Sequence, residues 1–127
     1  MTALRVLIVD DMEQVRQDLR MLLDLSGDVE IIGEAANGLE AIHQAEVLKP
    51  EVILMDLEMP VLNGYEAAKN IKSQQPTCRI IALTVHDYAL ARQKAFQAGI
   101  DAFSIKGEPV DILVKTILTE ERKENER

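Results

Sequence analysis

Polar residues, three of them carboxylates that could bind a metal ion, stand directly after the apolar segments of this 127-residue chain. Asp10 and Asp11 follow the first segment, Asp56 the third, Thr84 the fourth and Lys106 the fifth. Carboxylates that share a cleft of low dielectric repel one another, so either some are protonated or a cation joins them. Mg²⁺ prefers oxygen ligands and also accepts a phosphate oxygen. The residue types therefore predict a magnesium site, provided that the fold brings these side chains together.

Each of these residues also has an ordinary structural interpretation. Asp11 followed by Gln14 three positions later resembles a capping box at a helix start. Asp56 alone is typical of a turn, Thr84 of a hydroxyl bonded to backbone, and Lys106 of a solvated loop. Their joint placement at successive segment ends favours a functional site over four separate structural roles.

The apolar segments have the pattern of buried strands, and each is followed by residues with helical spacing. The first segment is nearly continuous in β-branched and aliphatic residues, as in a strand buried on both faces. The expected strands cover residues 4–9, 29–33, 52–55, 79–83 and 102–105. Helices are expected around Val15, Leu19, Leu22 and Leu23, ending at Ser26 and Gly27, and over residues 39–48, 65–73, 88–98 and 109–118, the last with proline in its first turn.

This alternation predicts an α/β fold with a doubly wound, five-stranded parallel sheet and five helices. In such folds ligands bind beyond the carboxyl ends of the strands, close to the point where the strand order reverses. All five polar residues named above would then meet at one edge of the sheet.

Length, charge and cysteine content limit the classes of function. A 127-residue chain fits one compact domain, which we expect over residues 1–119, with 120–127 as a tail or the start of a linker. The formal net charge of −8 argues against direct contact with nucleic acid or anionic membranes. No apolar run is long enough for a membrane span, and Cys78 is the single cysteine, so we expect a cytoplasmic protein.

The residues that carry the predicted site resemble the response-regulator receiver domains of two-component signalling, the superfamily of the chemotaxis receiver CheY. The resemblance covers Leu4 to Leu118. Its motifs are VDD at 9–11, MDLEMPVLNG at 55–64, LT at 83–84 and IKG at 105–107. GEAANG at 33–38 and ALTVHD at 82–87 look most like receivers of the NarL/FixJ type, which usually precede a helix-turn-helix DNA-binding domain. By analogy with these folds and flavodoxin we expect the strand order 2-1-3-4-5.

The resemblance implies a role for each residue of the site. Asp56 would be the phosphoacceptor, attacking a phosphohistidine on a sensor histidine kinase or phosphotransfer protein. Mg²⁺ would be bound by Asp11, Asp56 and the backbone carbonyl of Glu58, with Asp10 acting mainly through water. Lys106 and Thr84 would each contact a phosphoryl oxygen. Such a domain catalyses its own phosphorylation and dephosphorylation and is not an enzyme acting on other substrates.

Further positions of the resemblance concern switching and partners. Phe103 matches the aromatic that rotates with Thr84 during activation, and Met12 and Val15 match the surface that docks the kinase. A phosphorylation-dependent homodimer is also expected, and the output would be transcription regulation through a DNA-binding domain outside this chain, or that of a stand-alone regulator. Glu58 and His86 match positions that tune hydrolysis of the phosphoryl group. Gly107 departs from the family, where proline in a cis peptide often follows the lysine.

Three other functions fit these residues less well. A flavin-binding module would need a phosphate loop rich in glycine and hydroxyl groups where Asp10 and Asp11 stand. A phosphatase with an aspartate nucleophile would ordinarily place a second acid two residues after the first, where this chain has Met12. A receiver that is never phosphorylated would have lost part of the acid, hydroxyl and lysine set, which is intact here.

Overall fold

A computed structural model describes residues 3–85 and 89–119, and strands and helices alternate along these residues. The expected start of the fourth helix at Tyr88, His86 and the tail 120–127 lie outside the described residues. The strands are β1 (Leu4–Val9), β2 (Val29–Ala35), β3 (Val52–Asp56), β4 (Arg79–Thr84) and β5 (Ala102–Ile105). The helices are α1 (Glu13–Ser26), α2 (Gly38–Leu48), α3 (Gly64–Gln74), α4 (Ala89–Gln97) and α5 (Val110–Leu118).

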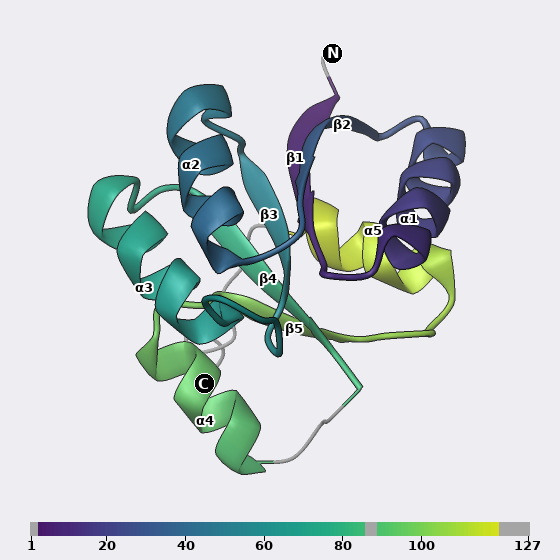
Figure 1. Ribbon diagram of the computed structural model, residues 1–127. Helices are drawn as coiled ribbons and strands as arrows, with labels where there is room; N and C mark the ends of the chain where they lie inside the picture. The colour runs from purple at the N-terminus through teal and green to yellow at the C-terminus, as the bar shows by residue number, and fades with distance from the viewer. Residues whose placement is uncertain (1–2, 86–88, 120–127) are drawn as a thin grey trace.

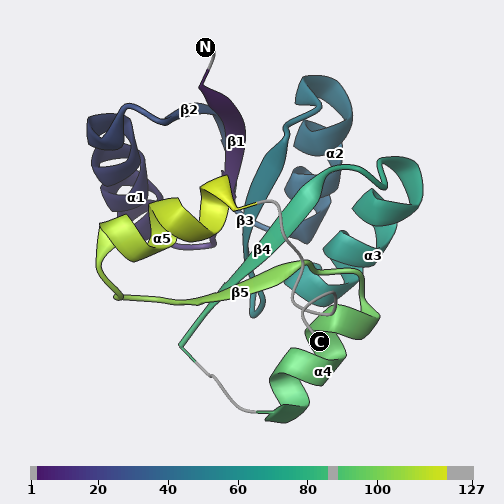
Figure 2. The same ribbon diagram turned by 180° about the vertical axis from the view of Figure 1, so that it is seen from behind.

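The strands form one parallel sheet in the order β2-β1-β3-β4-β5, which confirms the predicted fold and strand order. Helices α1 and α5 cover one face of the sheet, and α2, α3 and α4 cover the other (Figures 1 and 2). The order reverses between β1 and β3. The carboxyl ends of these two strands therefore border the crevice in which such folds bind ligands.

Alternate residues of the strands point to opposite faces and supply two separate cores. In β1, Leu7 and Val9 belong to the core beneath α2, α3 and α4, while Val6 and Ile8 belong to the core beneath α1 and α5. Both faces of the sheet are thus buried, which explains why the strands read as continuous apolar runs.

Several boundaries differ from those predicted. The second strand continues to Ala35 because β2 stays paired with β1 as far as Val9, past an irregularity in register between Val6 and Leu7. Asp56 is the last residue of β3 and pairs with Leu83. Pro109 precedes α5 as its N-cap instead of lying in the first turn, which corrects the predicted helix start.

Side-chain caps fix the starts of two helices on the same face of the sheet. The Asn37 side chain accepts a hydrogen bond of 2.9 Å from the Glu40 amide at the start of α2. The Asn63 side chain accepts one of 3.0 Å from the Glu66 amide at the start of α3. Such caps satisfy backbone donors that the helix leaves unpaired, and they anchor the loops that precede α2 and α3.

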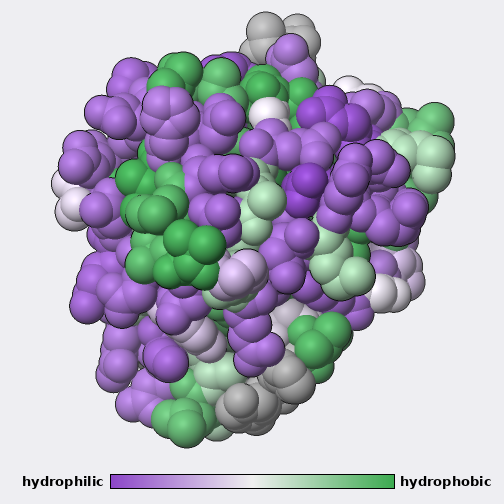
Figure 3. Space-filling model, in the orientation of Figure 1, coloured by the Kyte–Doolittle hydropathy of each residue, from purple (hydrophilic) through white to green (hydrophobic). Residues whose placement is uncertain are grey.

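The surface of the protein is largely polar on the face that Figure 3 shows. Apolar residues lie there in separate small areas. Within residues 3–85 and 89–119, none of the helices has both the length and the apolar character that crossing a membrane requires.

Candidate functional site

The five polar residues singled out in the sequence occupy the carboxyl ends of four neighbouring strands. Asp10 and Asp11 follow β1, Asp56 ends β3, Thr84 ends β4 and Lys106 follows β5. These strands are adjacent and parallel, so their carboxyl ends share one edge of the sheet. The fold brings together the residues that the sequence pattern selected.

Three carboxylates converge at this edge. One oxygen from each of Asp10, Asp11 and Asp56 lies within 4.8 Å of the others. Asp10 is completely buried and Asp56 is 6% exposed, whereas Asp11 is open to solvent. The donors are all oxygens, and the open side would leave room for water and a further ligand. This donor set fits a hard divalent cation such as Mg²⁺.

The Lys106 ammonium joins the two buried carboxylates. Its Nζ atom lies 2.8 Å from Asp10 Oδ2 and 3.3 Å from Asp56 Oδ1. Burial alone would lower the pKa of Lys106, but its hydrogen bond to Asp10 and the charges of Asp56 and Asp10 raise it above its ordinary value. Lys106 is therefore held as a cation at the centre of the site.

The surroundings of Asp56 favour the protonated form of its carboxyl group. Burial and the neighbouring charge of Asp10 raise the pKa of Asp56 from 3.8 to about 6, although Lys106 and the Glu58 amide act in the opposite direction. A carboxylate in this state gains from any additional positive charge near it. The electrostatics of the site thus favour binding of a cation next to Asp56.

The first acidic pair is held by contacts that the sequence analysis did not identify. The Met12 amide donates to Asp10 Oδ1 at 2.9 Å, and Arg16 donates from a guanidinium nitrogen to the Asp10 carbonyl oxygen at 2.7 Å. Met12 is the N-cap of α1 and its side chain makes no capping bond, so the alternative of Asp11 as N-cap is not what the structure shows. The interpretation of Asp11 as a metal ligand therefore no longer competes with a capping role.

Arg16 is itself oriented by Glu34. The Glu34 carboxylate accepts from Arg16 at 2.9 Å and from Arg20 at 2.8 Å. Partial burial would raise the pKa of Glu34, but the hydrogen bonds from Arg20 and Arg16 outweigh it and lower the pKa. Sequence reasoning missed this cluster because nothing in the spacing of Arg16 and Glu34 indicates that they meet.

The loop after Asp56 turns back against the end of β3. The Gly64 amide donates to the Leu57 carbonyl oxygen at 3.0 Å. A Cβ atom on Gly64 would overlap the Asp56 carbonyl oxygen, so only glycine fits here without a shift of the backbone. The Glu58 amide lies 3.4 Å from Asp56 Oδ1, and the Glu58 side chain is exposed. Gly64 thus allows the close approach that sets the path of the loop after Asp56.

Thr84 and Phe103 lie on the next two strands. Thr84 is 5% exposed, and its carbonyl oxygen accepts from the Lys106 amide at 2.9 Å. Phe103 is half-buried, with the Arg92 guanidinium 4.8 Å from its ring centroid and the Phe96 ring centroid at 6.3 Å. In this structure Phe103 is therefore packed against α4.

Met12 and Val15 lie on the α1 side of the site. Met12 is 58% exposed, whereas Val15 is half-buried. Val15 lines a groove between α1 and the β5–α5 loop together with Leu19, Leu22 and Lys106. The groove brings an apolar surface next to the carboxylate site.

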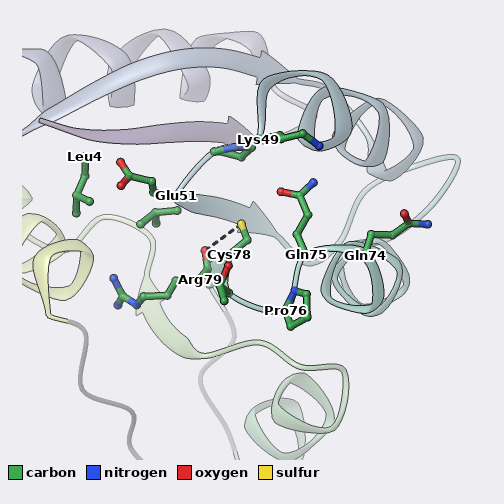
Figure 4. A pocket seen from close by; sticks show the side chains of 11 residues that line it. Leu4, Lys49, Glu51, Gln74, Gln75, Pro76, Cys78 and Arg79 are labelled. Carbon is green, nitrogen blue, oxygen red and sulfur yellow. Dashed lines mark hydrogen bonds between the residues drawn. The ribbon is translucent and has the colours of Figure 1, made fainter. Parts of the chain in front are cut away.

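A second hollow, shown in Figure 4, lies at the opposite edge of the sheet. It is lined by residues around the amino ends of β1, β3 and β4, including Leu4, Glu51 and Arg79. Burial raises the pKa of the Cys78 thiol there to about 11, so this thiol stays protonated and is a poor nucleophile. The chemistry of the described residues is concentrated at the carboxyl edge.

Comparisons with known proteins show which proteins this chain is similar to. The family model for the response regulator receiver domain matches residues 6–118. The transcriptional regulatory protein LnrK of Bacillus subtilis is 34% identical over 91% of this chain and 53% of its own length. The response regulator protein VraR of Staphylococcus aureus is 40% identical over 81% of this chain and 49% of its own. The chain thus spans about half the length of these curated relatives.

Solved structures show the same similarity in three dimensions. The response regulator domain of Thermotoga maritima CheB has a TM-score of 0.85 and 35% identity, covering 91% of this chain and 94% of that one. The receiver domain of the putative response regulator NarL from Mycobacterium tuberculosis has a TM-score of 0.88 and 30% identity, covering 93% and 95%. The carboxylates and lysine described above are set in a fold shared with these domains.

Proposed function

Because this chain belongs to the response regulator receiver domain family of two-component systems, we propose that Asp56 is its phosphoacceptor. The observation that carries this proposal is the place of Asp56 in the site. Its carboxylate belongs to the three-carboxylate cluster and lies 3.3 Å from the Lys106 ammonium. Asp10 shares both features but is completely enclosed, whereas Asp56 is 6% exposed, and Asp11 has no ion pair with Lys106 among the described contacts.

In the proposed reaction an Asp56 carboxylate oxygen attacks the phosphorus of a phosphohistidine on a sensor histidine kinase or phosphotransfer protein. A P–O bond forms while the P–N bond breaks, and the imidazole leaves with the electron pair of that bond. The product is an acyl phosphate. Hydrolysis of the acyl phosphate returns the domain to its starting state, so the domain would catalyse both its phosphorylation and its dephosphorylation.

The metal ion of the proposed site is Mg²⁺. Asp11, Asp56 and the backbone carbonyl of Glu58 would hold it, with Asp10 contributing through water. When bound, Mg²⁺ offsets negative charge on the carboxylates and on the phosphoryl oxygens. The oxygen-only donor set and the raised pKa of Asp56 support this assignment.

Lys106 and Thr84 would complete the phosphoryl site. Lys106 already carries its positive charge beside Asp56 and would move from the carboxylates to a phosphoryl oxygen. Thr84 would donate its hydroxyl to another. A charge-assisted hydrogen bond of this kind is about twice as strong as one between neutral groups.

The Thr84 hydroxyl also gives a route from phosphorylation to the distant surface. Drawing Thr84 towards a phosphoryl group would open space beside β5, into which Phe103 would rotate away from Arg92 and Phe96. Two states would then be biased by the new charge. A shift from about 1:99 to 99:1 requires about 5.5 kcal/mol. The half-buried position of Phe103 against α4 supports this switch.

The partners of the whole protein follow from its relatives. We propose that the histidine kinase or phosphotransfer protein docks on Met12 and Val15, and that phosphorylation promotes a homodimer. The output would be transcription regulation, as the name of the transcriptional regulatory protein LnrK suggests, through residues outside this chain or through a stand-alone regulator. The net charge of −8 supports a domain that does not itself contact nucleic acid.

Labelling with a small phosphodonor tests the proposal without a kinase. Incubation with acetyl phosphate and Mg²⁺ should add one base-labile phosphoryl group, measured by the intact mass. Chelation of divalent metal and Asp56→Asn should each abolish the addition. Labelling that persists after either change would contradict the proposal.

A further inference from the structure

The loop that carries Lys106 is held by a carboxylate that the mechanism above does not use. Glu108 Oε1 accepts a hydrogen bond of 2.7 Å from the Ser104 hydroxyl and one of 2.9 Å from the Ile105 amide. The Glu108 amide donates to the Ile105 carbonyl oxygen at 3.2 Å. The two residues that immediately precede Lys106 are thus tied to the residue two positions after it.

These bonds occupy groups that the sheet itself leaves open. β5 is the edge strand, and the Lys106 amide donates to Thr84 of β4. Successive amides of a strand point to opposite sides, so the Ile105 amide faces the open edge, where unpaired donors are found. The Ser104 hydroxyl is on a residue that is only 3% exposed. Glu108 therefore satisfies one edge donor and one buried donor.

The chain between these residues reverses sharply. Gly107 has φ of 92°, in the left-handed region that favours glycine, and a Cβ on it would meet nothing within 4 Å. A loop with a glycine at its centre has little intrinsic stiffness. The Glu108 carboxylate closes this loop and limits the positions open to the Lys106 backbone.

We propose that Glu108 is a positioning residue for Lys106, fixing the end of β5 so that the ammonium is aimed at Asp10 and Asp56. This inference rests on the proposed role of Lys106 in phosphoryl transfer. Position 108 needs a side-chain oxygen, either of a carboxylate or of an amide, because Glu108 accepts hydrogen bonds from two donors. A displacement of 1 Å in a catalytic group costs up to about a hundredfold in rate. Loss of the Glu108 contacts should let Lys106 shift by less than this, and the phosphorylation rate should fall by less than about a hundredfold.

The first readout needs neither phosphodonor nor metal. The rate at which an amine-acylating reagent modifies Lys106 is compared with that of Lys69, an exposed residue of α3, by peptide mass analysis. Glu108→Ala should raise the reactivity of Lys106 relative to Lys69 several-fold. Glu108→Gln, which keeps an acceptor oxygen, should restore most of the protection. Unchanged Lys106 reactivity in Glu108→Ala would overturn the proposal.

The second readout is the rate of labelling by acetyl phosphate with Mg²⁺. Glu108→Ala should slow labelling about tenfold, less than the roughly hundredfold ceiling for a 1 Å displacement. Glu108→Gln should recover most of the rate, and Ser104→Ala should fall between them. Asp111→Ala removes an equal charge from an exposed position in the first turn of α5 and should label at the wild-type rate.

A double-mutant cycle separates positioning from a general loss of structure. If Glu108 acts through Lys106, Glu108→Ala should slow labelling no further in the background of Lys106→Ala. An equal slowing in both backgrounds would overturn the proposal. If Glu108→Ala does not fold, the cycle is run with Ser104→Ala, which removes one of the two hydrogen bonds to Glu108. Absence of labelling in the wild type would contradict the proposed function, while the acylation rates would still decide the role of Glu108.

Discussion

Lys106 Nζ lies 2.8 Å from Oδ2 of Asp10, the carboxylate that is completely buried at the edge of the sheet. The Lys106 ammonium is paired with Asp10 and Asp56, two of the three carboxylates that would bind a metal ion. Lys106 and a bound Mg²⁺ would therefore compete for negative charge in the resting site, although both would be needed during the proposed phosphoryl transfer.

Lys106→Met should change metal binding and phosphorylation in opposite directions. Removing the ammonium leaves more negative charge, so Mg²⁺ should bind several-fold more tightly, as a loss of about 1 kcal/mol of competing interaction implies. Labelling by acetyl phosphate should fall strongly because one phosphoryl oxygen loses its partner. Mg²⁺ titration followed by amide chemical shifts measures the first effect. Weaker Mg²⁺ binding in Lys106→Met would contradict the competition.

The raised pKa of Asp56 predicts how stability depends on pH in metal-free protein. The folded state binds the Asp56 proton more tightly than the unfolded state, so the two differ in bound protons between pH 3.8 and about 6. The stabilisation that the protonated Asp56 side chain contributes to the folded state is fully present below pH 3.8 and is lost as the pH rises to about 6. The loss amounts to at most about 3 kcal/mol.

Asp56→Asn should lack this loss and be more stable than the wild type at pH 7. Urea unfolding across this pH range, with a chelator present, measures the difference between the two proteins. Added Mg²⁺ should reduce the difference by stabilising the wild type. If the wild type were as stable as Asp56→Asn at pH 7 without metal, the ionised Asp56 carboxylate would not destabilise the folded state.

Much of this arrangement was predictable from sequence because it depends on local patterns. The apolar runs predicted the strands. The position directly after a run then singled out Asp10, Asp56, Thr84 and Lys106 as site residues. The sheet order was taken by analogy, since periodicity does not determine which strands are neighbours. The extension of β2 to Ala35 depends on its pairing with β1, which is not encoded in either segment alone.

The contacts around the site were not predictable in the same way. Arg16 meets Glu34 and the Asp10 carbonyl only because α1 packs over the β1–β2 edge. Glu108 stands close to Lys106 in sequence, but its value as an acceptor depends on the direction of the Ile105 amide at the open edge of β5. Side-chain directions at the ends of elements are set by tertiary packing and not by residue spacing.

The proposed docking surface is testable with two equally exposed methionines, one at the N-cap of α1 and one within the helix. Met12, beside the site, and Met21, nearer the end of the helix, are each 58% exposed. Met12→Asp should slow phosphotransfer from the kinase and leave acetyl-phosphate labelling unchanged, because an apolar contact is lost only in the complex. Met21→Asp is the matched control. Equal slowing by both substitutions would contradict the proposal that Met12 belongs to the docking surface.

The proposed switch predicts a separation between phosphorylation and its consequence. Thr84→Ala should still accept a phosphoryl group on Asp56 but transmit it poorly, because the hydroxyl that moves is gone. Amide chemical shifts of Ala89–Gln97, recorded with and without beryllium fluoride and Mg²⁺, report on α4. Wild-type shift changes in Thr84→Ala would mean that the signal reaches α4 by another route.

Reductive trapping tests most directly whether Asp56 itself carries the phosphoryl group. Borohydride reduces an aspartyl phosphate to homoserine, which peptide sequencing by mass spectrometry locates within the chain. After incubation with acetyl phosphate and Mg²⁺, we predict homoserine at position 56 and unmodified aspartate at positions 10 and 11. Homoserine at either of those positions, with position 56 unchanged, would contradict the account.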